Sequence, residues 1–173
     1  MKTLLIIVSL FFSCQNQKST EILWNALLIP NQKEIPIYTT YKDSVIKYYI
    51  KNDTLKEEFI LIKIMEKKKG FFKVKTASAF NEEKISEGWI AIKNVGVYLR
   101  PRNEEEIIPI YDNPIKNSVY KNINGRKPEF FNLINIIDIK EKWLKIKYIE
   151  NKNIKEGWLN YENQCSNPYS TCN

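Results

Sequence analysis

The chain has 173 residues and a formal net charge of +7, with 43% apolar, 13% aromatic and 27% charged residues. This composition is typical of one or two folded domains and argues against disorder. The absence of histidine excludes Ser-His-Asp and Cys-His catalysis and histidine-ligated metal sites.

The first segment of the chain has the features of an export signal. Lys2 precedes a nine-residue stretch from Leu4 to Phe12 that only Ser9 interrupts, and Ser13-Cys14 follow. The stretch is too short to span a membrane. We therefore expect residues 1–13 to be a signal peptide.

The cysteine at the end of this segment resembles the bacterial lipoprotein signal, in which it becomes the lipid-modified first residue of the mature protein. Phe12 departs from the small aliphatic residue of that pattern. The alternatives are an ordinary signal peptide that leaves Cys14 free, or an uncleaved anchor. On the lipoprotein reading the protein is exported and anchored in the bacterial envelope, on the periplasmic face or in the outer membrane.

The rest of the chain contains the same series of short motifs twice. Five blocks recur in the same order, at offsets of 69 to 74 residues: 35–38 with 108–111, 43–45 with 117–119, 59–62 with 131–134, 71–75 with 143–147, and 87–90 with 156–159. Such a series indicates two tandem copies of one structural unit. We place the first unit at 20–99, a linker at 100–106 and the second unit at 107–173.

Each unit is predicted to be all-β. Apolar and lysine residues alternate in 72–75 and in 144–148, and the stretches 67–70 and 122–126 are typical of turns. We expect strand plus loop in 41–58 and in 115–130. Several short strands separated by turns favour a small barrel in each unit.

The order of the blocks resembles the bacterial SH3-like (SH3b) domain. The second copy fits through Tyr111 and Pro114, the Ser118-Val119 pair, Trp143-Leu144-Lys145-Ile146 and Gly157-Trp158-Leu159. The first copy has no proline after Tyr38, has Phe71 in place of the tryptophan, and carries a longer insert at 76–86. The chain ends in Cys165-Ser166-Asn167-Pro168 followed by Cys172. In this ending the whole mature chain is similar to small two-copy lipoproteins of Bacteroidetes. The resemblance implies a non-catalytic module that binds cell-wall peptides or partner proteins.

Two sets of aromatic residues are candidate site residues. Trp143 is out of phase with the apolar residues of its strand, and the resemblance places it with Tyr111 in a ligand groove. Phe71 and Tyr38 occupy the same places in the first copy. The alternative is that these rings only pack against the sister unit. For Gly88-Trp89 and Gly157-Trp158 we expect close backbone approach, with the indoles turned inward to close each barrel.

The remaining cysteines lie seven residues apart near the end of the chain. In an oxidising compartment Cys165 and Cys172 are expected to pair, although two unpaired thiols are the alternative. A zinc site is disfavoured, because two thiolates without histidine leave the metal under-coordinated.

The sequence favours a binding protein over an enzyme. Asp and Glu fall mainly in surface-like runs, and no phosphate-binding or calcium-binding loop is present. The excess of lysine favours anionic neighbours, while the export signal argues against nucleic acid. We expect neither metal nor cofactor. A cell-wall hydrolase and a purely structural envelope spacer are the alternative functions.

Overall fold

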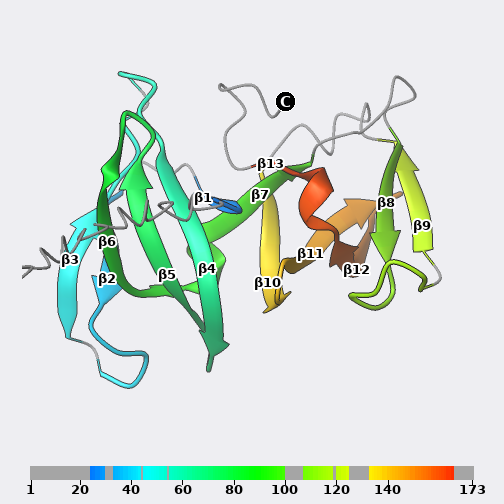
Figure 1. The fold of residues 1–173 in the computed structure, drawn as a ribbon, viewed down its shortest axis with the longest axis horizontal. Helices are drawn as coiled ribbons and strands as arrows, with labels where there is room; N and C mark the ends of the chain where they lie inside the picture. The colour runs from blue at the N-terminus through cyan, green and yellow to red at the C-terminus, as the bar shows by residue number, and fades with distance from the viewer. Residues whose placement is uncertain are drawn as a thin grey trace, which may run out of the picture.

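The computed structural model describes residues 24–29, 33–43, 45–53, 55–99, 107–118, 120–124 and 133–165. These residues form thirteen strands and two short 3-10 helices, so the all-β prediction is confirmed (Figure 1). The predicted signal peptide, Cys14, the predicted linker at 100–106 and Cys172 lie outside the described residues.

The first half of the molecule contains seven strands and one helical turn. They are β1 (Ala26–Leu28), β2 (Ile35–Tyr38), β3 (Ile46–Ile50), β4 (Ile60–Lys68), β5 (Phe71–Ser78), β6 (Asn81–Ala91), η1 (Ile92–Asn94) and β7 (Val95–Leu99). The predicted insert at 76–86 extends the β5–β6 hairpin, whose strands pair from Phe71 opposite Ala91 to Ser78 opposite Asn81.

The second half repeats this series. It consists of β8 (Ile107–Tyr111), β9 (Tyr120–Asn124), β10 (Ile134–Lys140), β11 (Trp143–Glu150), β12 (Asn153–Leu159), η3 (Tyr161–Asn163) and β13 (Gln164–Cys165). The predicted strand-plus-loop segments at 41–58 and 115–130 contain β3 and β9.

One antiparallel sheet runs through both halves in the order β3-β2-β6-β5-β4-β1-β7-β10-β11-β12-β8-β9, and β13 also pairs with β7. The first half reads β3-β2-β6-β5-β4-β1 and then β7. The second half reads β9-β8-β12-β11-β10-β7 and then β13. Strand β7 is therefore both the last strand of the first half and the first strand of the second (Figure 1).

The register of the strands also repeats. The β4–β5 ladder shifts between Ile64 and Glu66, and the β10–β11 ladder shifts between Ile136 and Asp138, 72 residues later. Such bulges bend a strand and increase its twist. The same irregularity at the same place bends both halves alike.

Strand alternation separates a buried face from an outer face. In β5, Phe72 and Val74 are fully buried, and Leu144 and Ile146 are their counterparts in β11. The lysines between them lie on the outer face, because successive side chains of a strand point to opposite sides. The alternation that the sequence shows is thus the burial pattern of the two central strands.

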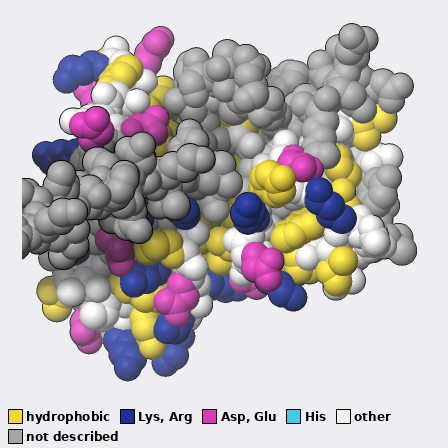
Figure 2. Space-filling model, viewed as in Figure 1, with side chains coloured by type: hydrophobic (Ala, Val, Ile, Leu, Met, Phe, Trp, Pro, Cys, Tyr) yellow, Lys and Arg dark blue, Asp and Glu magenta, His cyan; other side chains and the backbone are white. Residues whose placement is uncertain are grey.

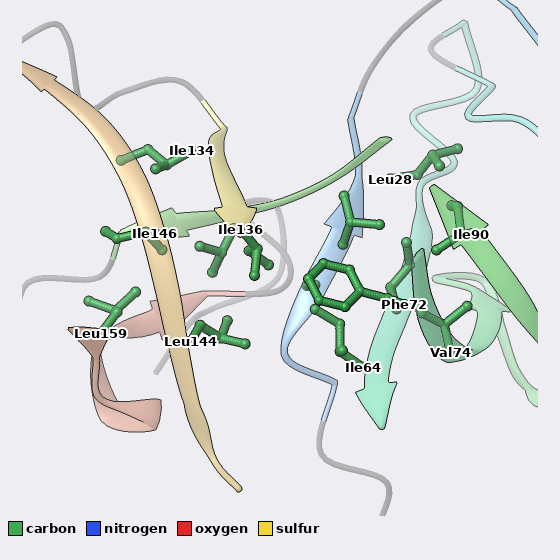
Figure 3. Close-up of a cluster of buried hydrophobic side chains, with 14 of the residues drawn as sticks. Leu28, Ile64, Phe72, Val74, Ile90, Ile134, Ile136, Leu144, Ile146 and Leu159 are labelled. Atoms are coloured by element: carbon green, nitrogen blue, oxygen red, sulfur yellow. The ribbon is translucent and has the colours of Figure 1, made fainter. Parts of the chain in front are cut away.

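A single apolar cluster connects the halves. It includes Leu28, Phe72 and Ile90 from the first half, Ile136 and Leu159 from the second, and Val95 and Val97 of the shared strand β7. Figure 3 draws side chains of this cluster from both halves.

An ion pair also crosses between the halves. Lys67 Nζ in β4 lies 3.2 Å from Asp138 Oδ2 in β10. The two repeats are therefore parts of one packed body rather than separate domains on a tether.

Candidate ligand-binding surfaces

Strand register gathers a set of side chains on the outer face of the first half. Trp89 lies opposite both Tyr38 in β2 and Lys73 in β5, and directly paired residues point to the same side. Phe71 and Glu87 have the same parity on their strands. We call this set the first aromatic face: Tyr38, Phe71, Lys73, Glu87 and Trp89.

The second half builds the same surface from the equivalent strands. Trp158 lies opposite Tyr111 in β8 and opposite Lys145 in β11. The second aromatic face consists of Tyr111, Trp143, Lys145, Glu156 and Trp158.

The structure brings together both aromatic pairs that the sequence predicts as groove residues. The ring centroids of Tyr38 and Phe71 lie 5.6 Å apart at 87°, and those of Tyr111 and Trp143 lie 5.0 Å apart at 84°. Both pairs have the edge-to-face geometry that aromatic rings favour. All four side chains are partly exposed, so each pair offers ring surface to solvent.

The close backbone approach expected at the two glycines before the tryptophans is present in the structure. A Cβ at Gly88 would collide with Ile37 Cγ2, and one at Gly157 would collide with Ile110 Cγ2. Each glycine faces the core and leaves room for the isoleucine of the neighbouring strand. This is why both halves retain glycine here.

The expected inward orientation is wrong for Trp158, whereas Trp89 is buried as expected. Since Gly157 and Leu159 face the core, alternation turns Trp158 to the outer side, where it is partly exposed. Trp89 likewise shares the outer side with Lys73, yet it is only 8% exposed. The Tyr41 ring, 5.0 Å away, packs on it.

The loop after β2 distinguishes the first face from the second. Tyr41 contacts Trp89, and the ammonium groups of Lys42 and Lys68 lie 5.9 and 5.6 Å from the Tyr41 ring centroid. The corresponding place in the second half holds Pro114. Trp158 is consequently less covered than Trp89.

Each face carries one ion pair between opposite charges. Lys73 Nζ lies 3.0 Å from Glu87 Oε1, and Lys145 Nζ lies 3.0 Å from Glu156 Oε2. The hydrogen bond from Lys73 lowers the pKa of the Glu87 carboxyl, and the charges of Lys73, Lys75 and Lys47 add to this. The rings are thus bordered by both a cation and an anion.

The aromatic faces differ from two open hollows in the structure. One hollow, of about 460 Å³, lies between the halves, and its wall includes Ile92, Lys93, Ile137 and Lys147. The other, of about 480 Å³, adjoins Ile154 in the β11–β12 hairpin. Neither of these two hollows is lined by a ring of the aromatic faces. Exposed hydrophobic side chains lie among lysines and acidic residues in Figure 2.

Within the ranges given above, no group of three His, Cys, Asp or Glu side chains is close enough to hold a metal ion. No helix in the same part of the chain is long and apolar enough to cross a membrane. Cys165 in β13 is 5% exposed, and its pairing with Cys172 stays a prediction.

Sequence reasoning missed that the two tryptophans and their neighbouring charges belong to the aromatic faces. The signal was present, since Trp158 alternates with Gly157 and Leu159 as Trp143 alternates with Leu144. The same phase argument that placed Trp143 outside also places Trp158 outside.

Comparison with known proteins gives no relative: no family model, no curated protein and no solved structure matches the chain.

Proposed function

We propose that this chain is a non-catalytic binding protein of the bacterial envelope whose two halves are SH3-like units. The observation that carries the proposal is the duplicated aromatic pair. Tyr38 with Phe71, and Tyr111 with Trp143, meet edge to face at equivalent places on the outer side of both halves. Partly exposed rings supply contact area at small conformational cost, which is typical of binding surfaces.

The ligand that best fits these surfaces is an extended peptide. Partly exposed aromatic rings on strands suit an extended chain, because the rings can contact apolar groups while neighbouring charges fix orientation. In each face a lysine and a glutamate lie beside the rings. We favour a peptide of the cell wall, with a peptide segment of an envelope protein as the alternative outcome.

The N-terminal signal and the cysteines support a location in the envelope. We propose that residues 1–13 are removed and that Cys14 is lipid-modified, which anchors the chain in a membrane. We also propose that Cys165 and Cys172 form a disulfide in that oxidising compartment.

The binding proposal is tested by sedimentation with purified peptidoglycan sacculi. Trp143→Ala should weaken retention by about fivefold or more, as loss of an aromatic hot spot does. Its melting temperature should change much less than that of Leu144→Ala, because the neighbouring leucine is fully buried. Equal destabilisation by both variants would show that Trp143 only packs.

Two further outcomes would redirect the proposal. Failure of the wild-type protein to sediment with sacculi, together with crosslinking in cells to an envelope protein, would favour the partner-protein alternative. A cleared zone in a zymogram with cell-wall substrate would overturn the non-enzymatic assignment.

Lipidation is tested separately with Cys14→Ala. We expect loss of acylation, with the protein released from membranes or left as its precursor. A variant that still partitions into membranes in the processed form would contradict the lipoprotein assignment.

A further inference from the structure

The outer faces of the two halves are built from closely matching residues. Four of the five positions carry the same residue in both aromatic faces, and only Phe71 and Trp143 differ. The identical pairs are Tyr38 and Tyr111, Lys73 and Lys145, Glu87 and Glu156, and Trp89 and Trp158.

The buried positions on the same strands are identical in some pairs and exchanged in others. Ile35 and Ile108, and Ile37 and Ile110, are identical, whereas the pairs Phe72 and Leu144, Val74 and Ile146, and Ile90 and Leu159 differ. Cores accept such exchanges where volume and apolar character are kept. Surface positions ordinarily tolerate substitution as well. The match at four of the five outer positions therefore indicates that the two faces share one role.

The two faces are also held at a fixed separation. Strand β7 pairs with β1 on one side and with β10 on the other, and the apolar cluster continues through it. The ion pair between Lys67 and Asp138 adds a contact across the junction. Neither face can reorient without breaking the sheet.

From these three observations we infer that the two aromatic faces bind two copies of the same group on one ligand. The inference rests on the proposed binding function and specifies its ligand class. This class is a polymer that bears a short peptide at regular intervals. Each peptide has an apolar group for the rings, an anionic group for Lys73 or Lys145, and a cationic group for Glu87 or Glu156.

Two linked sites of this kind bind a repetitive ligand far more tightly than a single repeat. Once one face is occupied, the second face encounters the next peptide of the same polymer at a high effective concentration. The apparent affinity typically increases by about 10²–10⁴ when the geometry allows both contacts. A soluble fragment with one peptide cannot gain in this way.

The experiment compares intact sacculi with the soluble single-peptide fragments that a muramidase releases from them. Wild-type protein should bind sacculi at least about 100-fold more tightly per peptide than it binds the fragment. Phe71→Ala or Trp143→Ala should remove most of this difference, while affinity for the fragment at the remaining face changes less than about twofold.

Two sets of variants guard against effects on folding. Lys73→Gln and Lys145→Gln leave the rings in place and should reduce avidity in the same way. Ile154→Ala, which changes a side chain 64% exposed outside both faces, should leave binding to sacculi and to the fragment unchanged.

The outcomes separate this inference from the function on which it rests. Equal affinity for sacculi and fragment would overturn the inference while leaving the binding function intact. Single-face variants that keep the full avidity would do the same. If wild-type protein bound neither sacculi nor fragment, the proposed binding of cell-wall peptide would itself be wrong, and the inference would fall with it.

Discussion

Trp158 and Leu159 are neighbours in β12 with opposite surroundings. Leu159 is fully buried in the apolar cluster, whereas Trp158 lies on the outer face. We expect Leu159→Ala to lower the free energy of unfolding by about 2–5 kcal/mol, as deletion of buried methyl groups does. Trp158→Ala should cost less despite its larger ring. Chemical denaturation of both variants checks the order, and a reversed order would place the indole in the core.

Gly157 is the residue at which a single methyl group should matter most. Gly157→Ala forces its Cβ against Ile110 Cγ2, and overpacking of this kind costs about 1–3 kcal/mol. Ile110→Ala removes the opposing atom, so the double variant should be less destabilised than the sum of the two single variants.

A matched pair in the first half provides the control for this cycle. Gly88→Ala and Ile37→Ala should show a coupling of the same sign, because the same two atoms meet there. Additive effects in both halves would contradict the steric explanation.

At the level of single residues, the sequence predicts which side chains are neighbours more reliably than it predicts whether a side chain faces the core or the solvent. The Tyr111–Trp143 and Tyr38–Phe71 pairs follow from the position of each motif in the repeat. The contact between the Tyr41 and Trp89 rings depends on the path of the loop after β2. Neither strand alternation nor motif spacing predicts the path of that loop.

Among the elements, the β5–β6 hairpin contains an ion pair whose contribution to the stability of the fold depends on pH. Lys73 lowers the pKa of Glu87 in the folded state, so the pair stabilises the fold above the unfolded pKa of about 4.3. This contribution is lost as the pH falls through the lower, folded pKa. Both side chains are about two-fifths exposed, so the effect is at most a few tenths of a kcal/mol.

The measurement is the free energy of unfolding at pH 7 and at pH 3. The loss of stability on acidification should be smaller in Glu87→Gln than in the wild type, and Lys73→Met should reduce it as well. An unchanged loss in Glu87→Gln would show that the ion pair does not stabilise the fold.

The strands themselves are largely predictable from sequence. Period-two alternation marks the central strands of both halves, and the bulges at Ile64 and Ile136 are the detail that it cannot supply. A bulge depends on how the ladder meets the neighbouring strands, and no residue type in the run signals it.

For the whole molecule, the pairing of strands at the junction between the repeats is the feature that could not be predicted from the sequence. Val95–Leu99 falls inside the first predicted unit, but it pairs with β1, β10 and β13. A local pattern identifies this segment as a strand. Which strands it pairs with depends on contacts between residues far apart in the chain.

Because β7 belongs to both halves, their minimal sequences overlap, and five residues would have to be present twice for each half to be complete alone. The chain is therefore suited to fragment complementation. If a protease site is inserted in 100–106 and cut, the second piece loses its covalent link to its own first strand. It should nevertheless stay bound, because β10 and β13 still pair with β7 in trans.

Co-elution of the two pieces in size-exclusion chromatography would demonstrate this, and their separation would contradict it. Gly96→Ala is the matching control, since its Cβ would lie 2.6 Å from Leu133 Cδ2 and 2.9 Å from the Ile134 carbonyl oxygen. The cut form of this variant should dissociate more readily. A shared strand thus turns a break in the backbone into a reversible association.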